Sequence, residues 1–359
     1  MVRRGSFIGG QDNLSVPDAP TIGAATAGSG QVSVAFTAPS DVGDDPITGY
    51  GASATDGTNV IGGTGSSSPV TISGLTNGTS YTAQVWAIND YGNGPLSAAT
   101  SSFTPASIAL IKGGYAASAP TNTVQKISVE TTGNSTDFGD LSESKGGSPG
   151  SSNGTRGLFW AGNKGGTNNK SSMIDYITIA NTGNASDFGD IWANGLNHSA
   201  ACGDDTRGIN AGGYGNYGNV GDGEYGAYQE EIEYVTYDTT SNSSDFGDLT
   251  QNRDEQASCS DMTIAVWAGG QENSTYDIID YVTIQTTGNA TDFGDLIHVN
   301  KFCSGTGDSV NGCICCGRNS SNNGAGDFIQ YITYATPGNA TDTCDALTAR
   351  HYTCSISGE

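Results

Sequence analysis

The stretch Ile-Asp-Tyr-Ile-Thr-Ile-Ala-Asn-Thr-Gly-Asn-Ala-Ser-Asp-Phe-Gly-Asp-Ile, residues Ile174–Ile191, occurs five times with small changes in a chain of 359 residues. Its Asp-Phe-Gly-Asp signature lies at Asp137–Asp140, Asp187–Asp190, Asp245–Asp248 and Asp292–Asp295, and survives as Asp342-Thr-Cys-Asp345. Successive copies are 50, 58, 47 and 50 residues apart. A period of this length with alternating apolar residues predicts one small β-sheet per repeat.

The composition favours strands over disorder. The chain has 54 glycines and only 14% charged residues, which would also suit a disordered polymer. Its 30 aromatic residues and the regular alternation of Val, Ile and Tyr instead indicate short strands joined by tight turns. No window has the 3.6-residue period of a helix, so we predict an all-β fold.

Each repeat contains four strand-like pieces. The first ends in Gly-Gly or a remnant of it, the second reads Ile-x-Tyr-Val-Thr-Ile, the third carries Asp-Phe-Gly-Asp, and the fourth is a strand of small residues. The second piece begins at Val124, Ile174, Ile232, Ile279 and Ile329. The repeats open on a Gly-Gly strand and end on a fourth-type strand at His351–Ser357. We therefore expect the last strand to complete the first sheet.

Four strands per unit with a terminal Gly-Gly resemble the blade of a kelch-type β-propeller, with Phe in place of the usual Trp. The resemblance implies a five-bladed propeller over residues 107–359, closed by the C-terminal strand. Closure would leave no exposed strand edge. An open solenoid would need capping units at both ends, and the sequence has no such units.

Residues 16–105 follow a different pattern. Pro17-Asp-Ala-Pro20 opens this segment, Val32–Phe36 alternates like a half-buried strand, and Gly74–Val85 contains Tyr81. The order of these motifs resembles a fibronectin type III domain. The resemblance implies that the Tyr81 hydroxyl binds the backbone upstream of it, and that Phe36 stands where this family usually has Trp. We interpret the segment as a spacer module, with a dedicated ligand site as the alternative.

Residues 1–15 form a short polar arm ahead of this domain. Arg3 and Arg4 are the only bases before Lys112. The arm is either a frayed terminus or an anchor that docks on an acidic partner. It lacks the apolar core of a secretory signal, and no segment of the chain has the ~20 apolar residues that span a bilayer.

The net charge of −24 limits the possible partners. Such an acidic surface repels phosphate backbones, so we expect no nucleic-acid binding. We also expect no membrane insertion. The eight cysteines, in a chain without a secretory signal, are expected to be reduced thiols.

The repeated Asp-x-x-Asp pairs are candidate carboxylate sites. Catalysis needs a pair once, whereas this spacing occurs five times at the same place in the repeat. We therefore expect the Asp and Asn side chains of Gly-Asn-x-Ser/Thr-Asp to hold their own turns. Calcium binding is the alternative, although the ligand spacing of a calcium loop is absent.

The cysteines are the next candidates. If the small-residue strands lie innermost in a propeller, Cys202, Cys259, Cys303 and Cys354 would surround its central channel. We expect them to be small residues that fit the narrow axis, because such a ring is too wide for metal ligation. On their strand, Cys313 and Cys315 are expected to share one face and Cys316 to lie on the other. We predict no metal and no other cofactor.

The sequence contains no catalytic motif that we can identify. Its three histidines, His198, His298 and His351, stand at unequal offsets in the repeat. Nucleophile-elbow, Walker and dinucleotide-binding motifs are absent. We expect no catalytic residues and no enzyme activity.

One insertion resembles a contact loop. The 58-residue spacing contains a Gly- and Asn-rich segment with Tyr214, Tyr217, Tyr225 and Tyr228. Tyr offers flat amphipathic area, and Gly and Asn let a loop adapt to a glycan or protein surface. A solvated loop that packs on its own sheet is the alternative.

The two patterns together suggest a function. A fibronectin type III segment followed by Thr-Gly-Asn-x-Thr-Asp-Phe-Gly-Asp-Leu repeats resembles structural proteins of tailed bacteriophages, notably those of marine cyanobacteria. The resemblance implies a non-enzymatic virion component, assembled in the host cytoplasm and multimeric in the particle. It would be a fiber or spike of the tail or capsid, bound to other tail, neck or capsid proteins. A glycan or protein of the host surface would be a further partner.

Two alternatives to an appendage remain open. One is a capsid decoration protein with a mainly stabilising role. The other is a carbohydrate-active enzyme built on a propeller.

Overall fold

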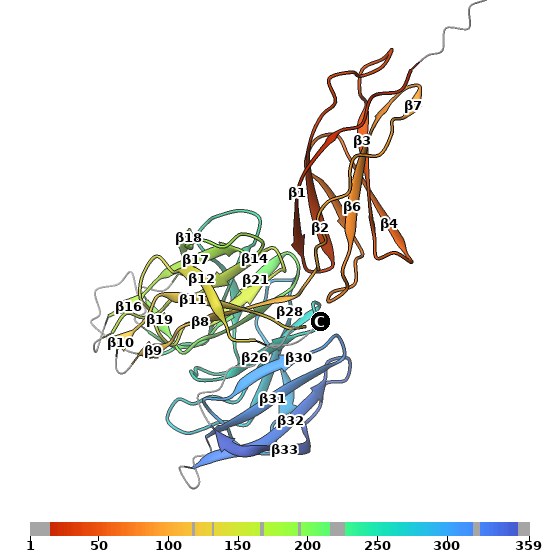
Figure 1. Cartoon of the computed structure of the whole chain (residues 1–359). Coiled ribbons are helices and arrows are strands. Elements are labelled where there is room, and N and C mark those ends of the chain that lie inside the picture. The colour runs from red at the N-terminus through yellow and green to blue at the C-terminus, as the bar shows by residue number, and fades with distance from the viewer. Residues whose placement is uncertain are drawn as a thin grey trace, which may run out of the picture. The chain divides into compact units, whose positions relative to one another are not determined.

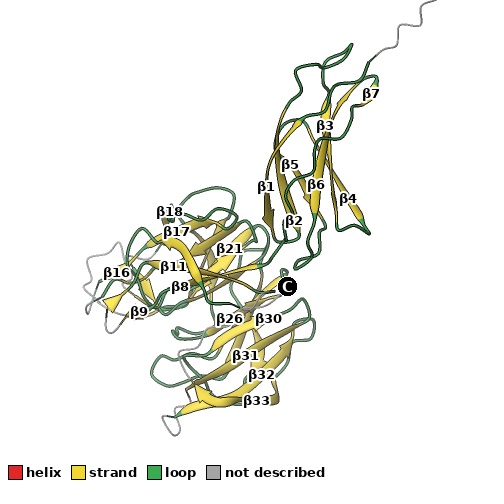
Figure 2. Ribbon diagram, in the orientation of Figure 1, coloured by secondary structure: helices red, strands yellow, loops and turns green. Residues whose placement is uncertain are grey.

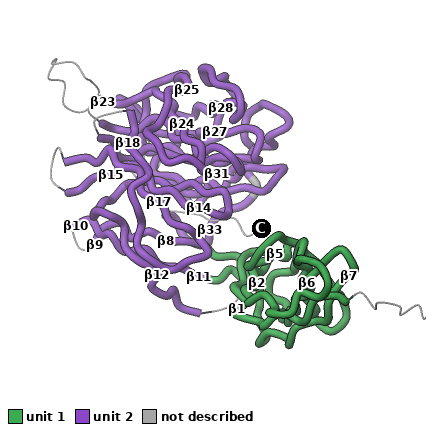
Figure 3. The backbone as a smooth tube through the Cα atoms, turned by 90° about the horizontal axis from the view of Figure 1, so that it is seen from above, with its two compact units in different colours: residues 1–108, 128–132 green, residues 109–127, 133–359 purple. Residues whose placement is uncertain are grey.

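The computed structural model describes residues 15–116, 119–130, 133–165, 169–192, 195–215, 227–318 and 324–350. Every regular element in these ranges is a β-strand (Figure 2), which confirms the predicted all-β class. Across the same ranges, no helix is long and apolar enough to cross a membrane. The chain divides into two compact units, residues 1–108 with 128–132 and residues 109–127 with 133–359 (Figure 3). Arg3 and Arg4 of the expected anchoring arm lie outside the described residues.

The first unit is a sandwich of two antiparallel sheets with the strand orders β1-β2-β5 and β4-β3-β6-β7 (Figure 1). Its strands are β1 (Thr21–Gly28), β2 (Gln31–Thr37), β3 (Gly49–Thr55), β4 (Val60–Gly65), β5 (Val70–Ser73), β6 (Thr82–Asn89) and β7 (Gly92–Asn93). Alternate residues of a strand point to the same face, so Val32, Val34 and Phe36 of β2 all enter the core between the sheets.

Two aromatic residues of this unit hold the predicted places. The Thr76 backbone N–H donates to the Tyr81 hydroxyl over 3.2 Å, which confirms the predicted bond to the upstream backbone. Phe36 is buried and its ring lies 4.6 Å from that of Tyr50. Phe36 is smaller than the Trp that is usual at this position, and the Tyr50 ring packs against it in the core.

The second unit consists mainly of five antiparallel sheets, which we call the first to fifth repeat sheets in chain order. The first has the order β12-β11-β8, with β8 (Ile108–Lys112), β11 (Thr123–Ser128) and β12 (Thr136–Asp140). The second has the order β13-β14-β17-β18, with β13 (Gly150–Ser152), β14 (Arg156–Phe159), β17 (Met173–Thr178) and β18 (Ser186–Asp190). The third has the order β20-β21-β24-β25, with β20 (Ala200–Gly203), β21 (Arg207–Ala211), β24 (Glu231–Thr236) and β25 (Ser244–Asp248).

The last two repeat sheets keep the same order. The fourth is β26-β27-β28-β29, with β26 (Ala257–Ser260), β27 (Ile264–Ala268), β28 (Ile278–Thr283) and β29 (Thr291–Asp295). The fifth is β30-β31-β32-β33, with β30 (Ser304–Gly307), β31 (Asn311–Arg318), β32 (Ala325–Thr333) and β33 (Thr341–Arg350). Short strands form three small sheets: β9 (Tyr115–Ala116) with β10 (Ala119–Pro120), β15 (Gly162–Asn163) with β16 (Lys170–Ser171), and β22 (Tyr214–Gly215) between β19 (Leu196–Asn197) and β23 (Ala227–Tyr228).

Each four-stranded repeat sheet has the small-residue strand at one edge and the Asp-Phe-Gly-Asp strand, or its fifth variant, at the other. The small-residue edge strands of consecutive sheets, β13, β20, β26 and β30, contact one another in turn. The first repeat sheet has no such strand within the described residues. The segment predicted to supply it, His351–Ser357, lies outside them.

The repeated stretch, of which Ile174–Ile191 is one copy, joins each sheet to the next one, and we call it the repeated phrase. The Gly183 N–H donates to the Phe138 carbonyl and the Ala185 N–H to the Asp140 carbonyl, both over 2.8 Å. Asn184 Oδ1 accepts the Asp140 N–H over 3.1 Å. The turn of one repeat is thus hydrogen-bonded to the Asp-Phe-Gly-Asp strand of the repeat before it.

The same arrangement recurs at later junctions, where Asn242 and Asn339 accept the N–H groups of Asp190 and Asp295. The prediction that these Asn side chains hold their own turns is therefore wrong, because they bind the preceding repeat. The Asp292 carboxylate does bind locally, accepting the Gly294 N–H over 2.9 Å.

Glycine is required in the Asp-Phe-Gly-Asp strand by this close approach. Gly247 has φ near +145°, and a Cβ there would lie 2.4 Å from the Gly288 backbone. A Cβ at Gly139 would lie 2.2 Å from the Gly183 carbonyl oxygen. Any side chain at these positions would push the next repeat away.

Buried ion pairs tie the sheets together from inside. Lys145 lies in the connection between the first and second repeat sheets and pairs with Asp175 of β17 at 3.0 Å. Arg253 plays the same part between the third and fourth sheets, pairing with Asp280 of β28 at 2.8 Å. All four side chains are fully buried. Each carboxylate follows the buried Ile of the repeated Ile-x-Tyr motif.

The cysteines pack between sheets. Cys202 and Cys259 hold equivalent positions in β20 and β26, but Cys303 precedes β30 and Cys354 lies outside the described residues. Cys303 therefore does not share the strand position of Cys202 and Cys259, and the expectation that four thiols surround a channel stays a prediction. Burial raises the pKa of Cys259 and Cys303 to about 12, so both thiols stay protonated.

The other cysteines of the fifth repeat sheet follow the expected alternation. Cys313 and Cys315 are both half-buried on β31, while Cys316 is buried at a bulge of that strand. Cys202, Cys259, Cys303, Cys313, Cys315 and Cys316 are free thiols.

Candidate functional site

Four residues in the connections between repeat sheets share one unusual backbone conformation. Gly147, His198, Glu255 and Phe302 have φ of 58°, 58°, 61° and 52°, and each precedes a small-residue edge strand. Their backbones form a chain of hydrogen bonds of 2.9 Å: His198 donates to Gly147, Glu255 to His198, and Phe302 to Glu255. The fold therefore brings residues of consecutive repeats side by side.

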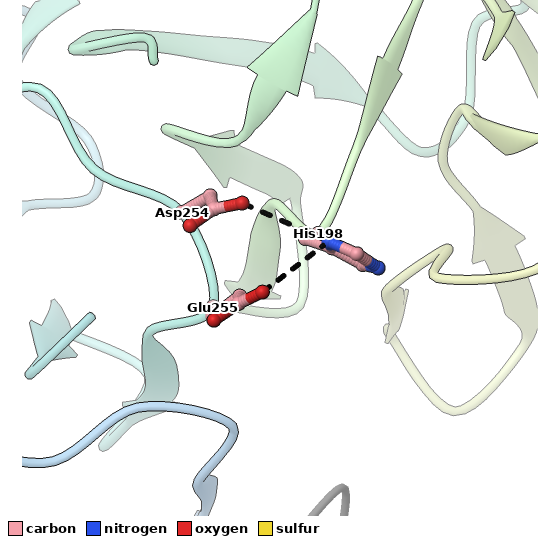
Figure 4. Close-up of side chains that lie close together, drawn as sticks. All are labelled: His198, Asp254 and Glu255. Atoms are coloured by element: carbon pink, nitrogen blue, oxygen red, sulfur yellow. Dashed lines mark ion pairs between the residues drawn. The ribbon is translucent and has the colours of Figure 1, made fainter. Parts of the chain in front are cut away.

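Two of these positions carry groups that can bind a ligand. His198 Nδ1 lies 3.7 Å from Asp254 Oδ2 and 3.7 Å from Glu255 Oε1 (Figure 4). The histidine comes from the connection between the second and third repeat sheets, and the two acids come from the next connection. Within the described ranges, these three are the residues whose ligating atoms all lie within 4.8 Å of one another in a group that could hold a metal ion.

Space for the imidazole comes from glycine at the preceding equivalent position. A Cβ at Gly147 would lie 2.6 Å from His198 Cδ2. The ring also meets the Phe302 ring edge-on, with centroids 6.3 Å apart. Gly147 and Phe302 thus lie next to the imidazole ring of His198.

The two acids are largely buried and lack a full set of hydrogen-bond partners. Asp254 is 4% exposed and Glu255 is 9% exposed, and neither Asp254 Oδ1 nor Glu255 Oε2 has a hydrogen-bond partner. The nearest cation to Glu255 Oε2 is Lys301 Nζ, at 3.9 Å. Burial, and then the adjacent Asp254 charge, raises the pKa of Glu255 to about 8. The charges of Lys301 and Arg318 offset part of this effect on Glu255, and Lys170 interacts electrostatically with Asp254.

The base of the tyrosine insertion lies in the same part of the second unit. Tyr214 of β22 is paired in register with Asn197 on one side and Tyr228 on the other. The two tyrosine rings meet edge-on at 5.2 Å, and Lys170 Nζ lies 4.2 Å from the Tyr214 ring centre. Burial, followed by the charges of Asp254 and Glu255, raises the pKa of the Tyr228 phenol.

The predicted contact loop is thus seen in part. Tyr214 and Tyr228 lie at its base, close in sequence and space to His198, while Tyr217 and Tyr225 lie outside the described residues. Sequence reasoning missed the site itself, since it compared histidines only with one another. Aligning the residue six or seven positions after each Asp-Phe-Gly-Asp-Leu/Ile would have paired His198 with Glu255.

A second feature lies at β24 and β25 of the third repeat sheet, beside Trp192. A hollow of about 280 Å³ is lined by Trp192, Glu231, Glu233, Asp245 and Asp248. Trp192 is 64% exposed, and its backbone N–H donates to Glu233 Oε2 over 3.1 Å. Carboxylates beside an aromatic face suit a cationic group.

Comparison with known proteins identifies the first unit. Residues 18–103 match the fibronectin type III domain family. This part of the chain is a fibronectin type III domain, as its motifs predicted. No curated protein matches the chain.

Proposed function

We propose that this chain is a non-enzymatic structural protein of a tailed-bacteriophage particle, forming a fiber- or spike-like appendage of the tail or capsid. The observation that carries the proposal is that the repeated phrase hydrogen-bonds each repeat sheet to the one before it. Its Gly-Asn turn and its Asp-Phe-Gly-Asp strand are occupied in joining successive sheets, so the repetition serves assembly of a stiff scaffold. The fibronectin type III domain supplies the spacer module expected of such a protein.

The repeat unit, in this proposal, is a five-bladed, kelch-like β-propeller. Four repeat sheets share one strand order, and their small-residue edge strands contact one another in turn. Within the described residues the first repeat sheet has three strands, with β8 at one edge, and a fourth strand could pair beside β8. Residues 351–357 have the sequence pattern of the strand that would fill it.

The propeller would contact the host surface or brace neighbouring virion proteins. Support comes from the aromatic groups that it presents, the Tyr214–Tyr228 pair and the exposed Trp192. Tyr and Trp give large contact area at a low cost in side-chain entropy.

Cryo-electron microscopy of intact particles that contain this chain tests the proposal. The expected result is density for the fibronectin type III domain and the repeat unit on a tail, neck or capsid appendage. Copies on every capsid lattice point would instead support a decoration protein. Release of oligosaccharides from host envelope polysaccharide by the purified chain would contradict the non-enzymatic part of the proposal.

A further inference from the structure

We propose that His198, Asp254 and Glu255 bind one divalent transition-metal ion, which clamps two successive inter-sheet connections together. The ligands would be His198 Nδ1, Asp254 Oδ2 and Glu255 Oε1. This inference does not depend on the proposed function, because it rests on the geometry of the three side chains alone.

The spacing of the donor atoms fits a metal better than it fits direct pairing. Nδ1 is 3.7 Å from each carboxylate oxygen, too far for a hydrogen bond. Metal–ligand bonds of about 2.1 Å place neighbouring donors roughly 3.0–3.4 Å apart at octahedral or tetrahedral angles. Each Nδ1–oxygen distance would therefore shorten by about 0.3–0.7 Å to seat an ion, and the three donor atoms already lie within 4.8 Å of one another.

The chemistry of the donors selects the class of ion. One imidazole and two carboxylates suit Zn²⁺, Mn²⁺ or Co²⁺, whereas Ca²⁺ and Mg²⁺ prefer oxygen ligands throughout. The Asn197 amide nitrogen lies 3.5 Å from His198 Nδ1, and a metal ion bound at Nδ1 would replace that contact. The side chain of His198 is 31% exposed, so solvent can reach the remaining coordination positions.

A second observation points to a missing cation. Asp254 is 4% exposed, yet its Oδ1 has no hydrogen-bond partner, and Figure 4 shows its carboxylate directed toward His198. Buried carboxylates are normally paired or bound to a metal. Among the described residues, Lys301 Nζ pairs with Glu255 Oε2 at 3.9 Å, while Arg318 and Lys170 act on the two acids from farther away. A divalent ion would give the Asp254 carboxylate the direct partner that it lacks.

The backbone at this site also favours a role for the side chains. The equivalent residue in the preceding connection is Gly147, which adopts φ of 58° without strain. His198, Glu255 and Phe302 adopt nearly the same conformation with side chains, although residues with side chains rarely do so. Strain of this kind is concentrated at ligand sites.

Titration of the chelator-treated full chain with MnCl₂ and CoCl₂, followed by calorimetry, tests the proposal. We expect one saturable site, and at least tenfold weaker binding in His198→Ala and in Asp254→Asn. Bound Co²⁺ should give weak d–d absorption without a thiolate charge-transfer band. His298→Ala and Cys344→Ser are the matched controls and should bind as the unaltered chain does.

The melting temperature without metal separates binding from folding. Glu255→Gln removes one of two adjacent buried acids, so it should melt at or above the temperature of the unaltered chain while binding Mn²⁺ at least tenfold more weakly. The proposal is overturned by absence of saturable binding, by affinity unchanged in His198→Ala and Asp254→Asn, or by a thiolate band that disappears in Cys344→Ser.

Discussion

At the scale of single residues, the repeat holds the backbone constant and varies the side chain. Gly147, His198, Glu255 and Phe302 share one left-handed conformation, but only the middle two bring ligating groups together. The residue after the first Ile of the Ile-x-Tyr motif varies in the same way. It is Asp175, Glu233, Asp280 or Gln330, and each accepts a backbone N–H from the preceding inter-sheet connection.

The Arg253–Asp280 pair gives a prediction at this scale. In Asp280→Ala the Arg253 guanidinium would remain buried without its partner, so we expect a loss of about 3–5 kcal/mol in the free energy of unfolding. Urea denaturation followed by tryptophan fluorescence measures it. Asp137→Ala, at an exposed position, is the control and should change the value by about 0.5 kcal/mol or less. A loss in Asp280→Ala no larger than in the control would show that the pair does not hold the sheets.

Lys112 gives a prediction of pH dependence. Burial, and then the nearby Lys145 charge, lowers the pKa of Lys112 to about 7 in the folded chain. The unfolded chain therefore binds more protons between pH 7 and pH 10.5, and this residue makes the fold more stable as pH rises through that window. The slope can reach at most ~1.4 kcal/mol per pH unit.

The comparison of Lys112→Met with the unaltered chain isolates this effect. The variant should be the more stable protein below pH 7, and its advantage should shrink as pH rises from 7 to 10. Urea denaturation at pH 6, 8 and 9.5 measures the difference. An advantage that stays constant over this range would mean that Lys112 keeps its proton.

At the scale of elements, the repeated phrase has two halves that bind different partners. The Ile-x-Tyr strand lies within its own sheet, with Tyr176, Tyr234 and Tyr281 packed edge-on against the Phe of the same repeat. The Gly-Asn turn instead binds the sheet before it. One phrase thus specifies both the sheet and its junction.

Replacing the junction glycine should weaken this contact. Gly247→Ala places a Cβ 2.4 Å from the Gly288 backbone at a φ of +145°, so we expect a loss of about 2–4 kcal/mol. Thermal denaturation monitored by circular dichroism measures it. Gly114→Ala, where a Cβ meets no atom within 4 Å, is the control and should melt within a few degrees of the unaltered chain. Equal melting of the two variants would contradict the inter-sheet role of Gly247.

At the scale of the whole molecule, the fifth repeat differs from the others at the junction position. Cys344 stands where Gly139, Gly189, Gly247 and Gly294 approach the next turn. A side chain there cannot accept a following turn in the same way. A ring that closes between the fifth and first repeats would therefore depend on the C-terminal strand rather than on this junction.

Hydrogen exchange tests that closure. If residues 351–357 pair with β8, their amides should exchange as slowly as those of β20 and β26, which are edge strands of the same kind. Mass spectrometry of peptic peptides from the full chain measures the rates. Exchange of 351–357 within seconds, beside slow exchange in β20, would contradict the closure.

Much of the fold could be predicted from the sequence because its information is local and repeated. Alternation with a period of two identified the strands, and the order of motifs around Tyr81 identified the fibronectin type III domain. The partner of the Asn184 side chain could not be predicted in this way, because it lies in the preceding repeat, 44 positions away. The described residues do not test the predicted contacts of Arg3, Arg4, Tyr217 and Tyr225.

The strands, the five repeats and the two-part organisation can therefore be read from the amino-acid order, since each depends on residues near one another in the chain. Which residues of different repeats meet depends on how the sheets pack in the folded protein. His198 and the acids Asp254 and Glu255 are more than 50 positions apart, and they converge because successive connections are hydrogen-bonded through left-handed residues. An alignment of the repeats can pair His198 with Glu255, but the close approach of their side chains arises from the stacking of successive sheets.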